Sequence, residues 1–285
     1  MKSSNELVVA LVGQPNCGKS TIFNAVAGFR VDTGNFSGTT VSFTETRITF
    51  EGRAIRLIDL PGTYSISSID LAEKVARDYL LSGRVDVMIN VADASILSRS
   101  LEFTLQLVEM GIPMVVGLNM FDDARRKGME IDTAGFRALT GVGAYPVVAV
   151  RGEGIVELFQ AAIALADNSG AYRPIRPVYD RDVEQCVASI IARYPDGLRA
   201  AMDCDPRFAV LRMLEMDSEF TGAAEKVDPA FNAFVTLRRR ELAEMHDWPE
   251  QSVLSSHRHA VVLDLYEKVV TLARKSLPGF FERLD

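Results

Sequence analysis

The chain has 285 residues, of which 48% are apolar and 24% charged, and its formal net charge at pH 7 is −7. This composition is that of a soluble globular protein, with room for one large domain or two ordinary ones. The acidic balance argues against nucleic-acid binding, which needs a basic surface. The three cysteines lack C-x-x-C spacing, which argues against a disulfide framework or a structural zinc site.

The first 167 residues alternate between strand-like and helix-like segments. Residues 51–53 turn the second strand-like segment back into the third, so these two are expected to form a hairpin. The alternation predicts an α/β fold with a mostly parallel sheet of six strands and helices on both faces. Strands are predicted at residues 6–13, 41–50, 54–60, 85–93, 113–119 and 145–150, and helices at residues 19–28, 70–83, 98–111 and 154–167.

Beyond residue 167 the strand signals nearly vanish. Residues 168–177 contain a glycine and two prolines without periodicity, which is typical of a linker. Four later segments have helical spacing. We therefore predict a domain of residues 1–167, a linker of residues 168–177 and a small all-α domain of residues 178–285. The four helices are predicted at residues 181–194, 207–216, 229–246 and 258–276.

Polar residues in the helical part show no spacing that indicates a site. The three histidines, His246, His257 and His259, lack the neighbouring Cys or carboxylate spacing of a metal centre, and we interpret them as solvated surface residues. The run from Arg238 to Arg240 is interpreted in the same way, as a solvated helix face.

A phosphate-binding motif stands between the first strand and the first helix. The segment GQPNCGKS, Gly13 to Ser20, matches G-x-x-x-x-G-K-[ST], whose backbone N–H groups cradle phosphates. Lys19 should neutralise the β- and γ-phosphates, and Ser20 should ligate Mg²⁺. The alternative is a glycine-rich turn with a surface lysine. Cys17 is interpreted as a small loop filler, the alternative being a redox sensor.

A second motif, DLPG, stands at the tip of the third strand. Asp59 at a strand end can orient the magnesium shell, and the N–H of Gly62 can reach the γ-phosphate. The alternative is a common strand-exit turn. Between the two motifs lies GNFSGTTV, where Thr39 or Thr40 can reach magnesium only when a γ-phosphate holds the loop, which is an order–disorder switch.

A third motif, NMFD, stands at the tip of the fifth strand. The carboxylate of Asp122 can accept hydrogen bonds from the N1–H and N2–H₂ groups of guanine, which adenine lacks. The alternative is that Asp122 caps a helix. Because ligands bind at the carboxyl ends of strands in open α/β sheets, the order of the three motifs favours guanine recognition.

The chain resembles a known family at these motifs. Its first part resembles the Ras-like GTPases of the translation-factor-related class, and more closely the ferrous iron transport protein B (FeoB) family. The methionine of NMFD, where most GTPases carry lysine, is also typical of FeoB. The resemblance covers residues 7 to about 165, and the helical part matches more loosely. It rests on GQPNCGKSTIFNAVAG, GNFSGTTV, DLPGTYS, NVADAS, LEFTLQLVEMGIPMVVGLNMFDDARRKGMEID and GEGIVEL.

The resemblance implies roles for single residues. Lys19 would contact phosphate, Ser20 and Thr40 would ligate Mg²⁺ with Asp59 behind a water, and Asn119 and Asp122 would read guanine. Asn16 matches the asparagine that helps to hold K⁺ in K⁺-activated members, although an amide there can equally brace the loop. Lys19, Thr40 and Asn16 are the candidate catalytic residues. The predicted nucleotide-binding residues are Gly13, Gln14, Pro15, Asn16, Cys17, Gly18, Lys19, Ser20, Thr21, Gly38, Thr39, Thr40, Asp59, Leu60, Pro61, Gly62, Asn119, Met120, Phe121, Asp122, Val148, Ala149 and Val150.

Two departures from the general GTPase pattern affect the expected activity. Thr63 stands where Ras carries the glutamine that positions water, as in the rest of the family, so slow intrinsic hydrolysis is expected. The loop that normally reads Ser-Ala-Lys is here Val148-Ala149-Val150. Ala149 can still offer its N–H to guanine O6, but the missing serine and lysine predict weak base affinity and fast GDP release.

The sequence thus predicts a slow GTPase that binds GTP or GDP with Mg²⁺, and the resemblance implies activation by K⁺. By resemblance, the helical part slows GDP release and precedes an Fe²⁺ permease in the membrane that this chain lacks. The end of the chain, ERLD, looks like the last stretch before a membrane helix. We therefore expect this chain to be soluble and, in the full-length protein, to lie at the cytoplasmic face of the bacterial inner membrane. No nucleic-acid partner is expected, and the sequence does not decide whether the chain forms a homo-oligomer.

Three alternatives remain open from the sequence. A soluble ribosome-associated GTPase usually carries a basic RNA-binding module, which neither the net charge nor the helical part supplies. A nucleotide sensor would bind GTP without turnover. A P-loop ATPase would bind ATP and GTP equally.

Overall fold

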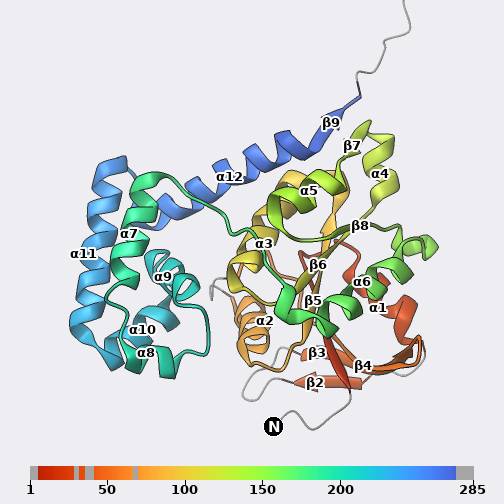
Figure 1. Ribbon diagram of the computed structural model, residues 1–285, viewed down its shortest axis with the longest axis horizontal. Coiled ribbons are helices and arrows are strands. Elements are labelled where there is room, and N and C mark those ends of the chain that lie inside the picture. Colours follow the sequence, from red (N-terminus) through yellow and green to blue (C-terminus); the bar gives the residue numbers. More distant parts are fainter. Residues whose placement is uncertain (1–5, 29–31, 36–41, 67–69, 274–285) are drawn as a thin grey trace, which may run out of the picture.

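The computed structural model describes residues 6–28, 32–35, 42–66 and 70–273, and contains a seven-stranded sheet (Figure 1). Its order is β2-β3-β4-β1-β5-β6-β8, and β1 is parallel to both β4 and β5. The hairpin of β3 and β4 is antiparallel, as predicted. The strands are β1 Leu7–Gly13, β2 Asp32–Asn35, β3 Ser42–Phe50, β4 Arg53–Asp59, β5 Val87–Asp93, β6 Met114–Asn119 and β8 Ala144–Pro146.

The α/β fold is confirmed, but the number of strands was wrong. The seventh strand is β2, which pairs with β3 at the edge of the sheet. Its sequence, DTGN, lacks both alternation and β-branched apolar residues, so only pairing with β3 defines it. The last predicted strand was too long: β8 ends at Pro146, and Ala149–Arg151 form a 3₁₀ turn.

Helices cover both faces of the sheet, and β1 is therefore buried on both sides. Val9 and Leu11 pack with Phe23 of α1 and Phe159 of α6, whereas the alternate residue Ala10 faces the core of α2 and α3. Asp70 caps α2 by accepting a hydrogen bond from the N–H of Glu73 at 2.8 Å. The helices are α1 Lys19–Ala27, α2 Leu71–Leu81, α3 Leu97–Met110, α4 Phe121–Arg126, α5 Thr133–Thr140 and α6 Ile155–Asp167.

The later part of the chain folds into helices, two of which the sequence did not predict (Figure 1). The additional helices are α8 and α10, which are short. The predicted helix over 258–276 was also wrong at its end. There α12 stops at Val269 and continues into β9, Val270–Leu272, which pairs with β7, Met129–Ile131. The helices are α7 Arg181–Ile191, α8 Asp196–Ala201, α9 Pro206–Leu214, α10 Ser218–Val227, α11 Pro229–His246 and α12 Val253–Val269.

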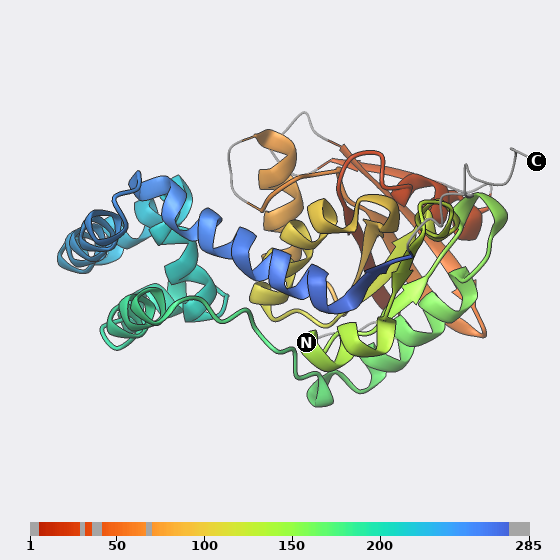
Figure 2. The same ribbon diagram turned by 90° about the horizontal axis from the view of Figure 1, so that it is seen from above.

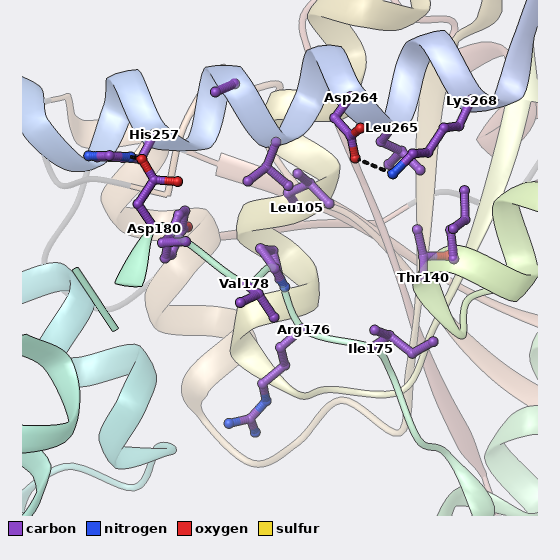
Figure 3. A pocket seen from close by; sticks show the side chains of 15 residues that line it. Leu105, Thr140, Ile175, Arg176, Val178, Asp180, His257, Asp264, Leu265 and Lys268 are labelled. Atoms are coloured by element: carbon purple, nitrogen blue, oxygen red, sulfur yellow. Dashed lines mark hydrogen bonds and ion pairs between the residues drawn. The ribbon is translucent and has the colours of Figure 1, made fainter. Parts of the chain in front are cut away.

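Helix α12 joins the helical part to the α/β part of the chain. It packs against α3 and α5, and Figure 2 shows it running from the helical bundle back toward β9. Beside it, residues 175–180 follow an extended path and enclose a cavity of about 410 Å³ with α3, α5 and α12 (Figure 3). The same hydrophobic cluster runs from α3 into α9 and α12, so a continuous core connects the two parts.

Buried charges also lie at this junction. The side chains of Arg212 and Arg258 approach Glu109 Oε2 at 3.6 and 3.5 Å, and Arg258 pairs with Glu215 at 2.6 Å. Tyr179 donates its hydroxyl hydrogen to Glu109 Oε1. Burial acts to raise the pKa of Glu215, but the charges of Arg212 and Arg258 hold that pKa below its usual value.

The interpretation of the histidines and arginines as solvated was partly wrong. His257 is only 6% exposed; its Nδ1 lies 3.3 Å from Asp180, and its ring meets that of His246 edge-on. Arg239 is buried and donates to Glu250 at 2.6 Å. Helical periodicity did not reveal this because the covering residues come from separate helices. Among the three histidines only His259 is exposed, facing Glu102, and among the three arginines only Arg240 is exposed.

Candidate functional site

The glycine loop lies between β1 and α1, at the carboxyl edge of the sheet. Gly18 adopts φ +87°, and a Cβ there would lie 2.1 Å from the amide nitrogen of Asn119, so a larger residue would strain the backbone and clash. The loop borders a cavity of about 540 Å³. This cavity is lined by Gln14, Pro15, Asn16, Gly18, Lys19, Ser20, Thr21, Gly62 and Met120.

Lys19 and Ser20 meet Asp59 at the tip of β4. The ammonium of Lys19 forms an ion pair with Asp59 Oδ1, and both side chains are buried. The hydroxyl of Ser20 donates to Asp59 Oδ2 at 3.1 Å. Ser20 lines the cavity, and a hydroxyl beside a carboxylate supplies the oxygen donors that Mg²⁺ prefers. The residues present therefore fit a magnesium ion.

The DLPG segment packs directly on the glycine loop. A Cβ on Gly62 would lie 3.1 Å from Pro15 Cα, so the two backbones come close there. The N–H of Thr63 donates to the carbonyl oxygen of Gly13 at 3.2 Å. The structure therefore brings these two motifs to the same cavity. Leu60 is buried in the strand exit, and Pro61 is half-buried.

Asn119 joins the glycine loop to the loop after β8. Its amide nitrogen donates to the carbonyl oxygen of Cys17 at 2.8 Å, and its Oδ1 accepts the N–H of Ala149 at 3.0 Å. The N–H of Ala149 was expected to donate to guanine O6, but in this structure it donates to Asn119. The hydrogen bonds that Asn119 makes tie three segments together at the edge of the sheet. Val148 and Ala149 are buried, whereas Val150 is 81% exposed.

Asp122 lies in the first turn of α4. The residue that caps this helix is Met120, at φ +56°, so Asp122 is not its N-cap. Arg151 donates to Asp122 at 3.1 Å and to Glu153 at 2.7 Å. Arg151 was not among the predicted site residues, because only folding places the turn after β8 beside α4.

Cys17 is buried in the glycine loop, and burial raises the pKa of its thiol to about 11. A thiol in this environment stays protonated at neutral pH and is a poor redox sensor. The location supports its interpretation as a loop filler.

The remaining predicted residues lie at the edge of the cavity or outside the described part. Asn16 is exposed at φ +65°, and Thr21 is exposed at the start of α1. Phe121, the first residue of α4, is buried. Gly38, Thr39 and Thr40 lie outside the described residues. In the ranges that the structure describes, no group of three or more His, Cys, Asp or Glu side chains is arranged for a metal ion, and no helix is long and apolar enough to cross a membrane.

Comparisons with known proteins point to one family. The model for ferrous iron transport protein B matches residues 7–162. The Fe(2+) transporter FeoB of Escherichia coli (strain K12) is 43% identical over 246 residues, which cover 83% of this chain and 30% of the transporter. A fusion of Fe(2+) transport protein A with Fe(2+) transporter FeoB from Porphyromonas gingivalis is 32% identical over 284 residues, 97% of this chain and 34% of the relative. The chain thus spans about a third of the length of these curated relatives.

Solved structures agree with the sequence matches. A GDP-bound variant of the S. thermophilus FeoB G-domain has a TM-score of 0.84 at 28% identity, covering 93% of this chain and all of that one. The cytosolic domain of the T. maritima FeoB iron transporter in its GMPPNP form has a TM-score of 0.75 at 29% identity, over 93% and 99% of the two chains. On the family match, the identities and the shared architecture, the chain belongs to the ferrous iron transport protein B family.

Proposed function

We propose that this chain is a GTP-hydrolysing switch whose output acts on a membrane permease for ferrous iron. The observation that carries the proposal is the position of Asn119, whose amide links the glycine loop to the 148–150 loop beside Asp122. That arrangement supports a guanine site at the end of a phosphate cavity. The related FeoB structures bound to GDP and GMPPNP support the same nucleotide class.

The chemistry proposed is attack of water on the γ-phosphate. Lys19 would bind the β- and γ-phosphates, and Gly62 would donate its N–H to the γ-phosphate. Ser20 and Thr40 would hold Mg²⁺, with Asp59 behind a water, and Asn16 would help to hold K⁺. These ions, when bound, neutralise negative charge on the phosphates. Because Thr63 offers no glutamine amide to position water, we expect slow hydrolysis without K⁺.

The proposed organisation follows the relatives. Residues 1–167 would form the G domain, residues 168–177 the linker, and residues 178–285 a helical regulatory domain. The matching relatives are about three times longer than this chain and are named as Fe(2+) transporters. We propose that the switch works at the cytoplasmic face of the bacterial inner membrane and acts on a permease domain like theirs.

The guanine assignment predicts a change of base preference in Asp122→Asn. We expect GDP affinity to fall about 100-fold, because a carboxylate that accepts two hydrogen bonds is lost. Binding of xanthine nucleotide should improve, since the asparagine N–H₂ can donate to its C2 oxygen. Displacement of a fluorescent nucleotide measures both affinities.

The matched control for base preference is Asp123→Asn, which changes the neighbouring carboxylate that pairs with Arg126. It should leave both affinities unchanged. Equal affinity of the wild-type protein for ATP and GTP would contradict the guanine assignment.

The K⁺ role of Asn16 predicts that K⁺ raises the hydrolysis rate by at least about tenfold over Na⁺ at equal ionic strength, a barrier change of about 1.4 kcal/mol. Because Asn16 has φ +65°, Asn16→Ala would also strain the loop, whereas Asn16→Gly removes the amide and keeps the backbone. Phosphate release in K⁺ and Na⁺ should be equal for Asn16→Gly. The control is Asn24→Ala, an exposed residue of α1.

If the wild type responds to neither cation, the K⁺ proposal is wrong. If Asn16→Gly keeps the full response, only the role of Asn16 is wrong.

A further inference from the structure

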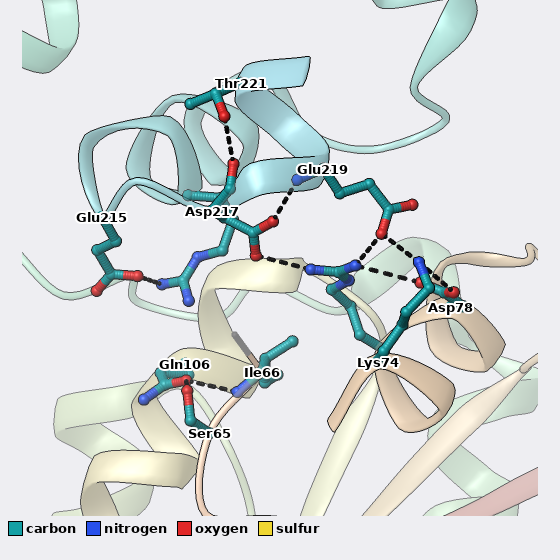
Figure 4. A network of polar contacts seen from close by, with 11 residues as sticks. Ser65, Ile66, Lys74, Asp78, Gln106, Glu215, Asp217, Glu219 and Thr221 are labelled. Atoms are coloured by element: carbon teal, nitrogen blue, oxygen red, sulfur yellow. Dashed lines mark hydrogen bonds and ion pairs between the residues drawn. The ribbon is translucent and has the colours of Figure 1, made fainter. Parts of the chain in front are cut away.

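The three residues that follow Thr63 lie along helix α3. Ser65 Oγ and the N–H of Ile66 both donate to the side-chain oxygen of Gln106, at 3.2 and 2.9 Å (Figure 4). Gln106 is buried, so this amide oxygen binds the segment in a site largely closed to water. The segment that begins with Asp59 is thus anchored on α3 as soon as it leaves the cavity.

Arg99 contacts the same segment one residue earlier. Its guanidinium lies 5.0 Å from the centre of the Tyr64 ring, a cation–π distance. Its backbone oxygen accepts a hydrogen bond from Gln14 Nε2 at 3.1 Å, and Gln14 belongs to the glycine loop. Arg99 and Gln106 are seven residues apart, so they lie on the same face of α3.

These contacts hold Gly62 from two directions. On one side Pro15 touches it, and the next residue, Thr63, donates to Gly13. On the other side residues 64–66 are fixed to α3, a helix of 14 residues whose positions are mostly buried. The position of the Gly62 N–H relative to the glycine loop is therefore set by α3 as well as by the loop itself.

We propose that Gln106 and Arg99 are positioning residues for GTP hydrolysis. They act through residues 64–66, and so place the N–H of Gly62 where the γ-phosphate binds. The inference rests on the proposed function, because only GTP brings a γ-phosphate. A donor displaced by 1 Å can cost about 100-fold in rate. GDP lacks the group that Gly62 would contact, so GDP affinity should not depend on this placement.

The test compares Gln106→Leu with Gln106→Glu. Leucine removes the acceptor, whereas glutamate keeps an oxygen for both donors. We expect Gln106→Leu to lower kcat for GTP about 10- to 100-fold, with GDP affinity within about twofold of wild type, and Gln106→Glu to restore most of the rate. Phosphate release gives kcat, and titration with fluorescent GDP gives the affinity. Glu102→Gln, at a half-exposed position of α3 whose side chain pairs with His259 and does not contact residues 64–66, should behave as wild type.

A second pair of variants leaves the core intact. Tyr64 is 49% exposed, so Tyr64→Ala removes the ring under Arg99 without opening a cavity. Its kcat should fall, and Tyr64→Phe, which keeps the ring, should have the wild-type rate.

Two results would overturn the inference. One is a wild-type kcat in both Gln106→Leu and Tyr64→Ala. The other is an equal loss of GDP affinity and kcat, because that indicates general damage to the fold. A wild-type protein that binds GTP without hydrolysing it contradicts the proposed function itself, so the two failures are distinguishable.

Discussion

Replacing Arg77 by leucine is expected to lower the free energy of unfolding by about 3–5 kcal/mol, because it leaves a buried carboxylate without its cation. Arg77 of α2 and Asp217, before α10, are each 1% exposed at the side chain and lie 2.7 Å apart. The same guanidinium forms an ion pair with Glu219 (Figure 4). It also lies 5.4 Å from the centre of the Phe220 ring. Urea unfolding measures the change.

The matched control for Arg77 is Lys74→Ala on the same helix. Lys74 also pairs with Glu219, at 2.7 Å, but its side chain is 41% exposed, so the expected loss is below about 1 kcal/mol. Equal effects of the two substitutions would show that the Arg77–Asp217 pair is not the main contact between α2 and the helical part.

The Arg77–Asp217 pair also joins α2 to the helical part. Helix α2 begins at Leu71, shortly after the DLPG segment that packs on the glycine loop. Its far side is held on α10 by buried charges. Helix α2 therefore follows the DLPG segment in the chain and contacts the helical part through Arg77.

The second large effect is expected from Lys19→Met, which keeps the length of the side chain and removes its charge. Affinity for GTP should fall by about 30-fold to several thousand-fold, because losing one partner of a buried charge pair costs about 2–5 kcal/mol. Lys19 is 7% exposed and pairs with Asp59, whose negative charge would then face the phosphates alone. Titration with fluorescent GTP measures the loss.

Lys226→Met is the control for Lys19, since Lys226 lies exposed in the last turn of α10. Its affinity should equal that of the wild type. Unchanged GTP binding in Lys19→Met would contradict a phosphate role for the glycine loop as a whole.

Local sequence patterns were enough to place the three motifs relative to the strands. The glycine loop, DLPG and NMFD each follow a buried strand, and strand tips of a parallel sheet meet at one edge. Prediction failed where a residue acts through distant partners. The spacing of NMFD indicated Asn119, but not that its amide would join Cys17 and Ala149, which are 102 and 30 residues away.

By itself, then, the sequence determined the alternation of the main strands and helices, without β2, β9, α8 and α10, and it determined where the phosphate and guanine motifs stand in the chain, because apolar periodicity and fixed motif spacing act over a few residues. The tertiary structure alone decided the burial of His257, the pairing of β9 with β7, and the attachment of residues 64–66 to Gln106. Each of these depends on which surfaces meet when the chain closes. Which surfaces meet depends on packing and desolvation between segments that are far apart in the chain, and local sequence patterns do not contain this information.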